Sequence, residues 1–151
     1  MRTLDVRMNI RIDRKPDVVR QQFADVAHHQ RASVHRGVRF EVIDDAPGQC
    51  RYRQITRLGP LRLRQEFLLV RSDEGPLVNT VLAGQFAGGA ISFDVRPDPG
   101  SDNRSHVEAR LAAELTGVQV LLAPMLRRSV ARALATALQE DKDDLERGGY
   151  G

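Results

Sequence analysis

Three of the four histidines lie close together in the sequence, at His28, His29 and His35, in a segment without a regular hydrophobic pattern. Histidine titrates near neutral pH, so each of these side chains is a candidate general acid or base. No metal site is expected, because adjacent histidines cannot easily bind one ion and no cysteine, aspartate or glutamate stands at ligand spacing. We expect these histidines to lie in a solvated loop, with acid or base catalysis as the alternative.

Two other patterns that could carry chemistry have simpler explanations. Ser33 and His35 do not indicate a nucleophile and its base, because nothing near them marks an oxyanion hole or an orienting acid. Gly84, Gly88 and Gly89 lie between predicted strands and do not form a phosphate-binding loop. A β-bulge or a tight bend explains them better.

A Gly59-Pro60 turn predicts a hairpin between the segments CRYRQITRL and LRLRQEFLLV. If the loop has two residues, Tyr52 faces Phe67, Gln54 faces Gln65 and Thr56 faces Leu63. This mostly apolar set is expected to point inward. The two glutamines either bond each other or an ordered water, or they orient a bound ligand together with Tyr52 and Thr56.

The opposite face of the hairpin is charged and is expected to face water. Its arginine stripe consists of Arg51, Arg53, Arg57, Arg62 and Arg64. Such a stripe is usually a solvated surface. A protein-interaction module that uses it to bind an acidic partner is a third hypothesis for the function.

A long helix is predicted from about Val118 to Arg147. One of its faces carries Leu122, Leu126, Val130, Ala133, Leu134 and Ala137. The small side chains Ser129, Ala133 and Ala137 either allow close packing on a sheet or leave space, and with a curved sheet we favour space. Beyond Glu140 the apolar stripe fails, so we expect the helix to project past the core there.

The remaining elements are predicted to form a sheet that this helix covers. Residues 3–12 alternate as a strand, Pro16 opens a helix, and six more strand patterns follow from Val38 to Leu115. A sheet with one apolar face needs a cover, and only the C-terminal helix is long enough. We expect one α+β domain over residues 1–151, with a seven-stranded antiparallel sheet around that helix.

Composition excludes several classes of protein. The net charge is +3 and only Lys15 and Lys142 are lysines, so no concentrated basic face for nucleic acid is expected. No apolar run approaches the roughly 18 residues of a membrane-spanning helix, and charges interrupt the N-terminal stretch where a signal peptide would be apolar. The single cysteine, Cys50, agrees with a reducing cytosol.

Two segments resemble a known family. IRIDRKPDVVRQQFADV joins an apolar strand to a helix with Val19 and Asp25 at characteristic places. LLAPMLRRSVARALATALQEDKDDLE has a leucine-rich entry, then Pro124, Arg127 and Arg128, and an acidic end. Together they resemble the polyketide cyclase/dehydrase family of the START-related (SRPBCC) superfamily. Members commonly carry a tryptophan after the first helix, whereas this chain has none and carries HHQRASVH there.

The resemblance implies a helix-grip fold with an internal cavity for an apolar or aromatic small molecule or lipid, without a cofactor. Because the superfamily includes carriers and ring-closing enzymes, binding or transport is the first hypothesis. The alternative is a polyketide-type aromatase/cyclase or dehydratase, with Tyr52 or a histidine as acid or base. The predicted ligand-binding residues are Tyr52, Gln54, Thr56, Gln65, Phe67, Ser129, Ala133 and Ala137.

Overall fold

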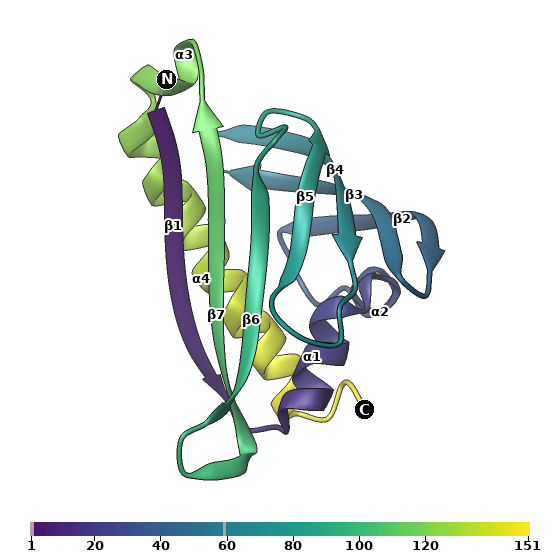
Figure 1. Cartoon of the computed structure of the whole chain (residues 1–151). Coiled ribbons are helices and arrows are strands. Elements are labelled where there is room, and N and C mark those ends of the chain that lie inside the picture. Colours follow the sequence, from purple (N-terminus) through teal and green to yellow (C-terminus); the bar gives the residue numbers. More distant parts are fainter. Residues whose placement is uncertain (1, 59) are drawn as a thin grey trace.

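In the residues that the computed structural model describes, 2–58 and 60–151, seven strands form one antiparallel sheet (Figure 1). The strands are β1 (Arg2–Ile12), β2 (Val38–Ala46), β3 (Gln49–Leu58), β4 (Leu61–Val70), β5 (Leu77–Ala83), β6 (Ala90–Asp98) and β7 (Ser101–Leu115). Their order is β1-β7-β6-β5-β4-β3-β2. Strands β2 to β7 are therefore a simple meander, and β1 returns to pair with β7. The predicted strand number and antiparallel pairing are confirmed.

The helices lie at the ends of this meander. They are α1 (Pro16–Ala24), α2 (Val26–Ala32), α3 (Val118–Leu121) and α4 (Ala123–Glu146). Proline suits the first turn of α1, because its missing N–H would have no helical partner there. Asp25 separates α1 from α2, and its side chain accepts a hydrogen bond of 3.0 Å from the backbone N–H of His28. Figure 1 shows α4 running along β1, with its last turns beside α1.

The hairpin of β3 and β4 has the predicted register. Tyr52 pairs with Phe67, Gln54 with Gln65 and Thr56 with Leu63. The inward side chains of this hairpin are largely buried, whereas Arg57, Arg62 and Arg64 are exposed on the outer face. Arg51 and Arg53 pair with Glu66 on that same face. The predicted Gly59-Pro60 turn falls partly outside the described residues, because Gly59 is not among them.

The glycine-rich connection between β5 and β6 is a tight turn, as expected. Gly84 has a φ of +117°, and a Cβ there would lie 2.7 Å from Cγ of Gln65. A Cβ on Gly89 would lie 2.8 Å from the carbonyl oxygen of Ala112. Only glycine allows these close approaches, which fold the turn over the sheet and bury Phe86.

The prediction for the C-terminal helix was wrong in two respects. The helix is broken at Leu122, because Pro124 fits only the first turn of α4 and cannot continue α3. Its far end does not project past the core: Asp141 and Leu145 are buried. The N-terminal segment covers that end, where the Arg14 guanidinium donates a 2.6 Å hydrogen bond to the carbonyl of Leu145. In the described part of the chain, α4 and the shorter helices all fall short of the length and apolarity needed to cross a membrane.

Candidate functional site

A cavity of about 140 Å³ lies between the inner face of the sheet and α4. Its walls come from α1, α2, all of the strands except β1, and α4. Most of the lining is apolar or aromatic, including Phe23, Phe40, Phe86 and Phe93. An apolar hollow with a few polar groups is the usual form of a small-molecule site.

Six of the eight predicted ligand-binding residues line this cavity. They are Tyr52, Gln54, Thr56, Gln65, Ala133 and Ala137. Phe67 does not line it, because its ring is fully buried and stacks against Tyr52 at a centroid distance of 5.2 Å. Ser129 is half-buried and is also absent from the lining. The alanines thus face open space, and their role in binding a ligand stays a prediction.

The polar groups of the sheet wall bond to protein partners, but the two glutamines do not bond each other. The Gln54 amide donates to Oγ1 of Thr56 at 3.0 Å, and Oε1 of Gln65 accepts from the backbone N–H of Phe86 at 3.1 Å. The Tyr52 hydroxyl donates to Oδ1 of Asn79 at 2.8 Å. Burial raises the pKa of Tyr52, so its phenol stays protonated and cannot serve as a base at neutral pH.

The expectation of a solvated histidine loop was wrong. His28, His29 and His35 are only 8%, 6% and 6% exposed. The segment from α2 to β2 folds inward over the end of α4, and the rings of His29 and His35 stack at a centroid distance of 5.3 Å. Phe40 packs against both rings. His29 and His35 therefore form part of the cavity wall.

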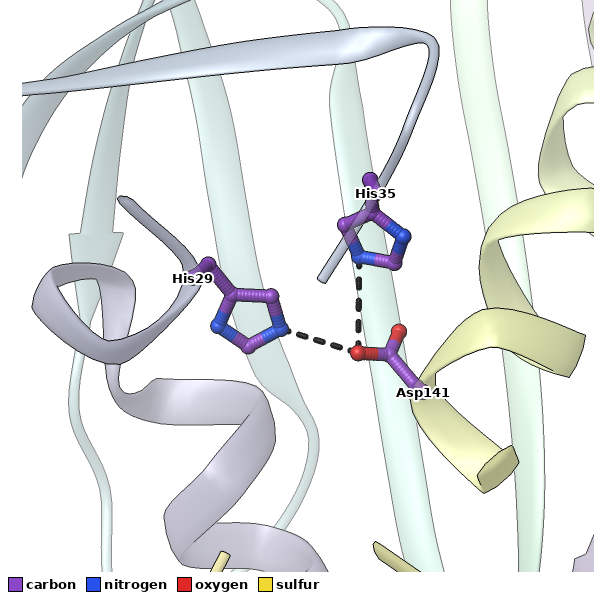
Figure 2. A group of neighbouring side chains, drawn as sticks. All are labelled: His29, His35 and Asp141. Carbon is purple, nitrogen blue, oxygen red and sulfur yellow. Dashed lines mark hydrogen bonds and ion pairs between the residues drawn. The ribbon is translucent and has the colours of Figure 1, made fainter. Parts of the chain in front are cut away.

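Asp141 of α4 joins the two histidines (Figure 2). Its Oδ1 lies 2.9 Å from Nε2 of His29 and 3.4 Å from Nε2 of His35. The other ring nitrogens are also bonded. Nδ1 of His29 lies 2.8 Å from the carbonyl oxygen of Asp25, and Nδ1 of His35 lies 3.2 Å from Oε1 of Glu140. These bonds fix the orientation of both rings.

Two neighbouring contacts complete this group. His28 bonds Oδ2 of Asp144 through its Nε2 at 2.8 Å. The Gln22 amide donates to Asp141 at 3.0 Å and to Asp144 at 3.1 Å. Its own Oε1 is buried and has no hydrogen-bond partner within residues 2–58 and 60–151. The amide thus holds the buried Asp141 carboxylate and the partly buried Asp144 carboxylate in place while its oxygen remains unsatisfied.

The charges of this group stabilise one another. Burial alone would lower the pKa of His35, but the charge of Asp141 and hydrogen bonds to Asp141 and Glu140 raise it overall. Burial alone would raise the pKa of Asp141, but the charge of His35 and hydrogen bonds from both histidines lower it. These shifts favour the charged pair, in which an ionised Asp141 carboxylate lies beside a protonated His35 imidazole. Both ring nitrogens of His29 and of His35 have protein partners, so either histidine would have to release one partner before it could act as a general acid or base.

Sequence reasoning missed this group because its members lie far apart in the chain. One signal was present: acidic residues interrupt the apolar stripe of α4 at Glu140 and Asp144, on its buried side. Carboxylates on a buried face need partners, and three histidines were available to supply them. Acidic residues on the buried side of α4 therefore indicate a buried polar cluster rather than the point where the helix leaves the core.

Comparison by sequence finds neither a matching family model nor a matching curated protein. Comparison by structure finds clear similarities. The protein TTHA0849 from Thermus thermophilus superposes with a TM-score of 0.84 at 17% identity, over 95% of this chain and 98% of that one. The Zhui aromatase/cyclase from Streptomyces sp. R1128 gives 0.79 at 14% identity, over 97% and 95%.

A START superfamily protein from Mycobacterium smegmatis superposes with a TM-score of 0.75 at 11% identity, over 95% of this chain and 97% of that one. At such identities, the similarity establishes the architecture and leaves the activity open. The expectation drawn from the two resembling segments is thus confirmed at the level of the fold. The chain has the helix-grip fold of START-related proteins, in which a long C-terminal helix lies against an antiparallel sheet.

Proposed function

We propose that the protein binds a small apolar or aromatic molecule between the sheet and α4. The observation that carries this proposal is the apolar-lined cavity of about 140 Å³. An engineered cavity of about 150 Å³ in another protein stays dry and binds benzene, so this space matches roughly one aromatic ring. A single-ring compound therefore fits better than a long lipid chain.

The polar groups in the wall favour a ligand that is not purely hydrocarbon. Gln54 and Thr56 lie on the sheet side, and His29 and His35 lie beside the end of α4. A phenol or an aromatic ketone could place its ring among the phenylalanines and its oxygen beside one of these groups. Such hydrogen bonds fix a ligand's orientation, while the apolar contacts supply most of the affinity.

Native mass spectrometry of the purified protein, followed by titration with single-ring phenols, tests the proposal. We expect a bound molecule, or saturable binding of one phenol per chain that displaces an apolar fluorescent probe. Stronger binding of long-chain fatty acids than of single-ring compounds would contradict the size argument. Absence of any saturable apolar ligand would contradict the proposed function.

Ring closure of a polyketide-like substrate is a second candidate. It is favoured by one observation: His29 and His35, both oriented by carboxylates, line the cavity. Ring closure needs a base that removes a proton beside a carbonyl and an acid that protonates an oxygen. The structural similarity to the Zhui aromatase/cyclase also supports ring closure as a candidate activity.

Incubation with a short linear poly-ketone thioester, analysed by mass spectrometry, tests this second candidate. We expect a cyclised product with the parent protein, and loss of that product with His35→Gln while phenol binding persists. Equal product formation by the parent and by His35→Gln would exclude the histidine as the acid or base.

A further inference from the structure

The nitrogen and oxygen atoms around Asp141 form a candidate ligand set for a metal ion. One nitrogen of His29, one nitrogen of His35 and one carboxylate oxygen of Asp141 all lie within 4.8 Å of one another (Figure 2). Zinc binds nitrogen and carboxylate oxygen at about 2.0–2.2 Å, so its ligand atoms lie about 3–4 Å apart. Oδ1 of Asp141 already lies 2.9 Å from Nε2 of His29 and 3.4 Å from Nε2 of His35, which is close to that spacing.

The surroundings of the histidines are those of metal ligands. A ligating histidine almost always donates its second ring N–H to a carbonyl or a carboxylate, which orients the ring toward the ion. Nδ1 of His29 has the Asp25 carbonyl as its partner, and Nδ1 of His35 has the Glu140 carboxylate. Both Nε2 atoms are left facing Asp141. The ligating carboxylate is itself held by the Gln22 amide.

The charge around the cluster favours a cation. Asp141 is only 4% exposed. Within residues 2–58 and 60–151, every ion pair of Glu140, Asp141 and Asp144 is to a histidine and none is to lysine or arginine. A buried carboxylate without a permanent positive partner is costly unless protonated histidines or a metal ion balance it.

We propose that His29, His35 and Asp141 bind a divalent transition-metal ion at one end of the cavity. Two histidines and one carboxylate with remaining open positions form a ligand set known for divalent zinc and iron. Because all three side chains line the cavity, an ion held by them would lie at its wall. This site goes beyond the proposed function, since it can be occupied without any organic ligand.

Calorimetric titration of tag-free, chelator-treated protein with Zn²⁺, and visible spectroscopy with Co²⁺, test the site. We expect one ion per chain, a rise in the melting temperature with excess Zn²⁺, and visible Co²⁺ bands from a site with nitrogen ligands. Asp141→Asn, which keeps the size of the side chain, and His35→Gln are each expected to weaken Zn²⁺ binding at least about 100-fold.

His28→Gln is the matched control. His28 is on the same helix as His29, is similarly buried and also bonds a carboxylate, Asp144, yet it is outside the proposed ligand set. Its variant is expected to bind Zn²⁺ within about threefold of the parent. Absence of binding by the parent protein at millimolar Zn²⁺ would overturn the proposal, as would parent-like binding by Asp141→Asn. The Zn²⁺ titration of the parent protein involves no variant, so it tests the proposal even if a variant fails to fold.

Discussion

Tyr52 on β3 and Asn79 on β5 are joined by a buried hydrogen bond of 2.8 Å, although β4 lies between their strands. The Tyr52 ring crosses the inner face of β4 by stacking on Phe67, with an angle of 10° between the ring planes. This contact ties three strands together directly beneath the cavity. It also places a polar bond in a wall that is otherwise largely apolar.

Replacing Tyr52 with Phe is expected to lower the free energy of unfolding by about 1–3 kcal/mol, because Oδ1 of Asn79 then loses its partner inside the protein. Denaturant unfolding measures the change. The double variant with Asn79→Leu is the control, since no unpaired amide remains in it. If the two substitutions simply add, the hydrogen bond contributes no coupling between these residues.

Leu126→Ala is expected to cost about 2–5 kcal/mol in unfolding free energy, as large-to-small core substitutions do. Leu126 is 3% exposed on the face of α4 that packs on the sheet. Leu121→Ala is a matched control, because Leu121 is 82% exposed and its loss should change stability by less than about 0.5 kcal/mol. Similar costs for both variants would mean that α4 does not dock as described.

Ala133→Phe is expected to fill the cavity. The added ring has existing space to occupy, so the melting temperature should hold or rise while binding of an apolar fluorescent probe falls sharply. Ala135→Phe, on the exposed side of α4, should leave probe binding unchanged. A clear drop in melting temperature with Ala133→Phe would indicate overpacking, which costs about 1–3 kcal/mol, and would argue against an open cavity.

The Cys50 thiol is expected to resist alkylation in the folded protein. Burial, followed by the charge of Asp45, raises the pKa of Cys50 to about 11. At pH 8 the thiol is therefore almost entirely protonated, and the reactive form is the thiolate. Labelling with iodoacetamide at pH 8 should be slow in buffer and fast in guanidinium chloride. Fast labelling of the native protein would show that the start of β3 opens readily.

The sheet could be predicted from the sequence in detail, because alternation and turn residues are local signals. In β3 and β4 the apolar and charged residues alternate so regularly that a slip of one residue would bury arginines. Both the pairing of Tyr52 with Phe67 and the outward direction of Arg57 and Arg62 follow from that pattern.

The histidine cluster could not be predicted in the same way. His29 and Asp141 are 112 positions apart, and their contact depends on how the segment after α1 folds over the end of α4. Hydrophobic periodicity describes each element alone and carries little information about where two irregular ends meet. For a related reason, the break at Leu122 was not predicted. The apolar stripe continues across the break, whereas Pro124 ends the helical hydrogen bonding.

The pairing of β1 with β7 has a consequence for the order in which the protein folds. Strands β2 to β7 pair with their neighbours in the chain, whereas Arg2 at the start of β1 faces Leu115. Contacts between distant segments form slowly, because the intervening chain must first lose its conformational freedom. During synthesis β1 therefore waits without a partner until β7 emerges. The 24 residues of α4 come later still. The cavity between the sheet and α4 thus closes only after the residues of α4, up to Glu146, have left the ribosome.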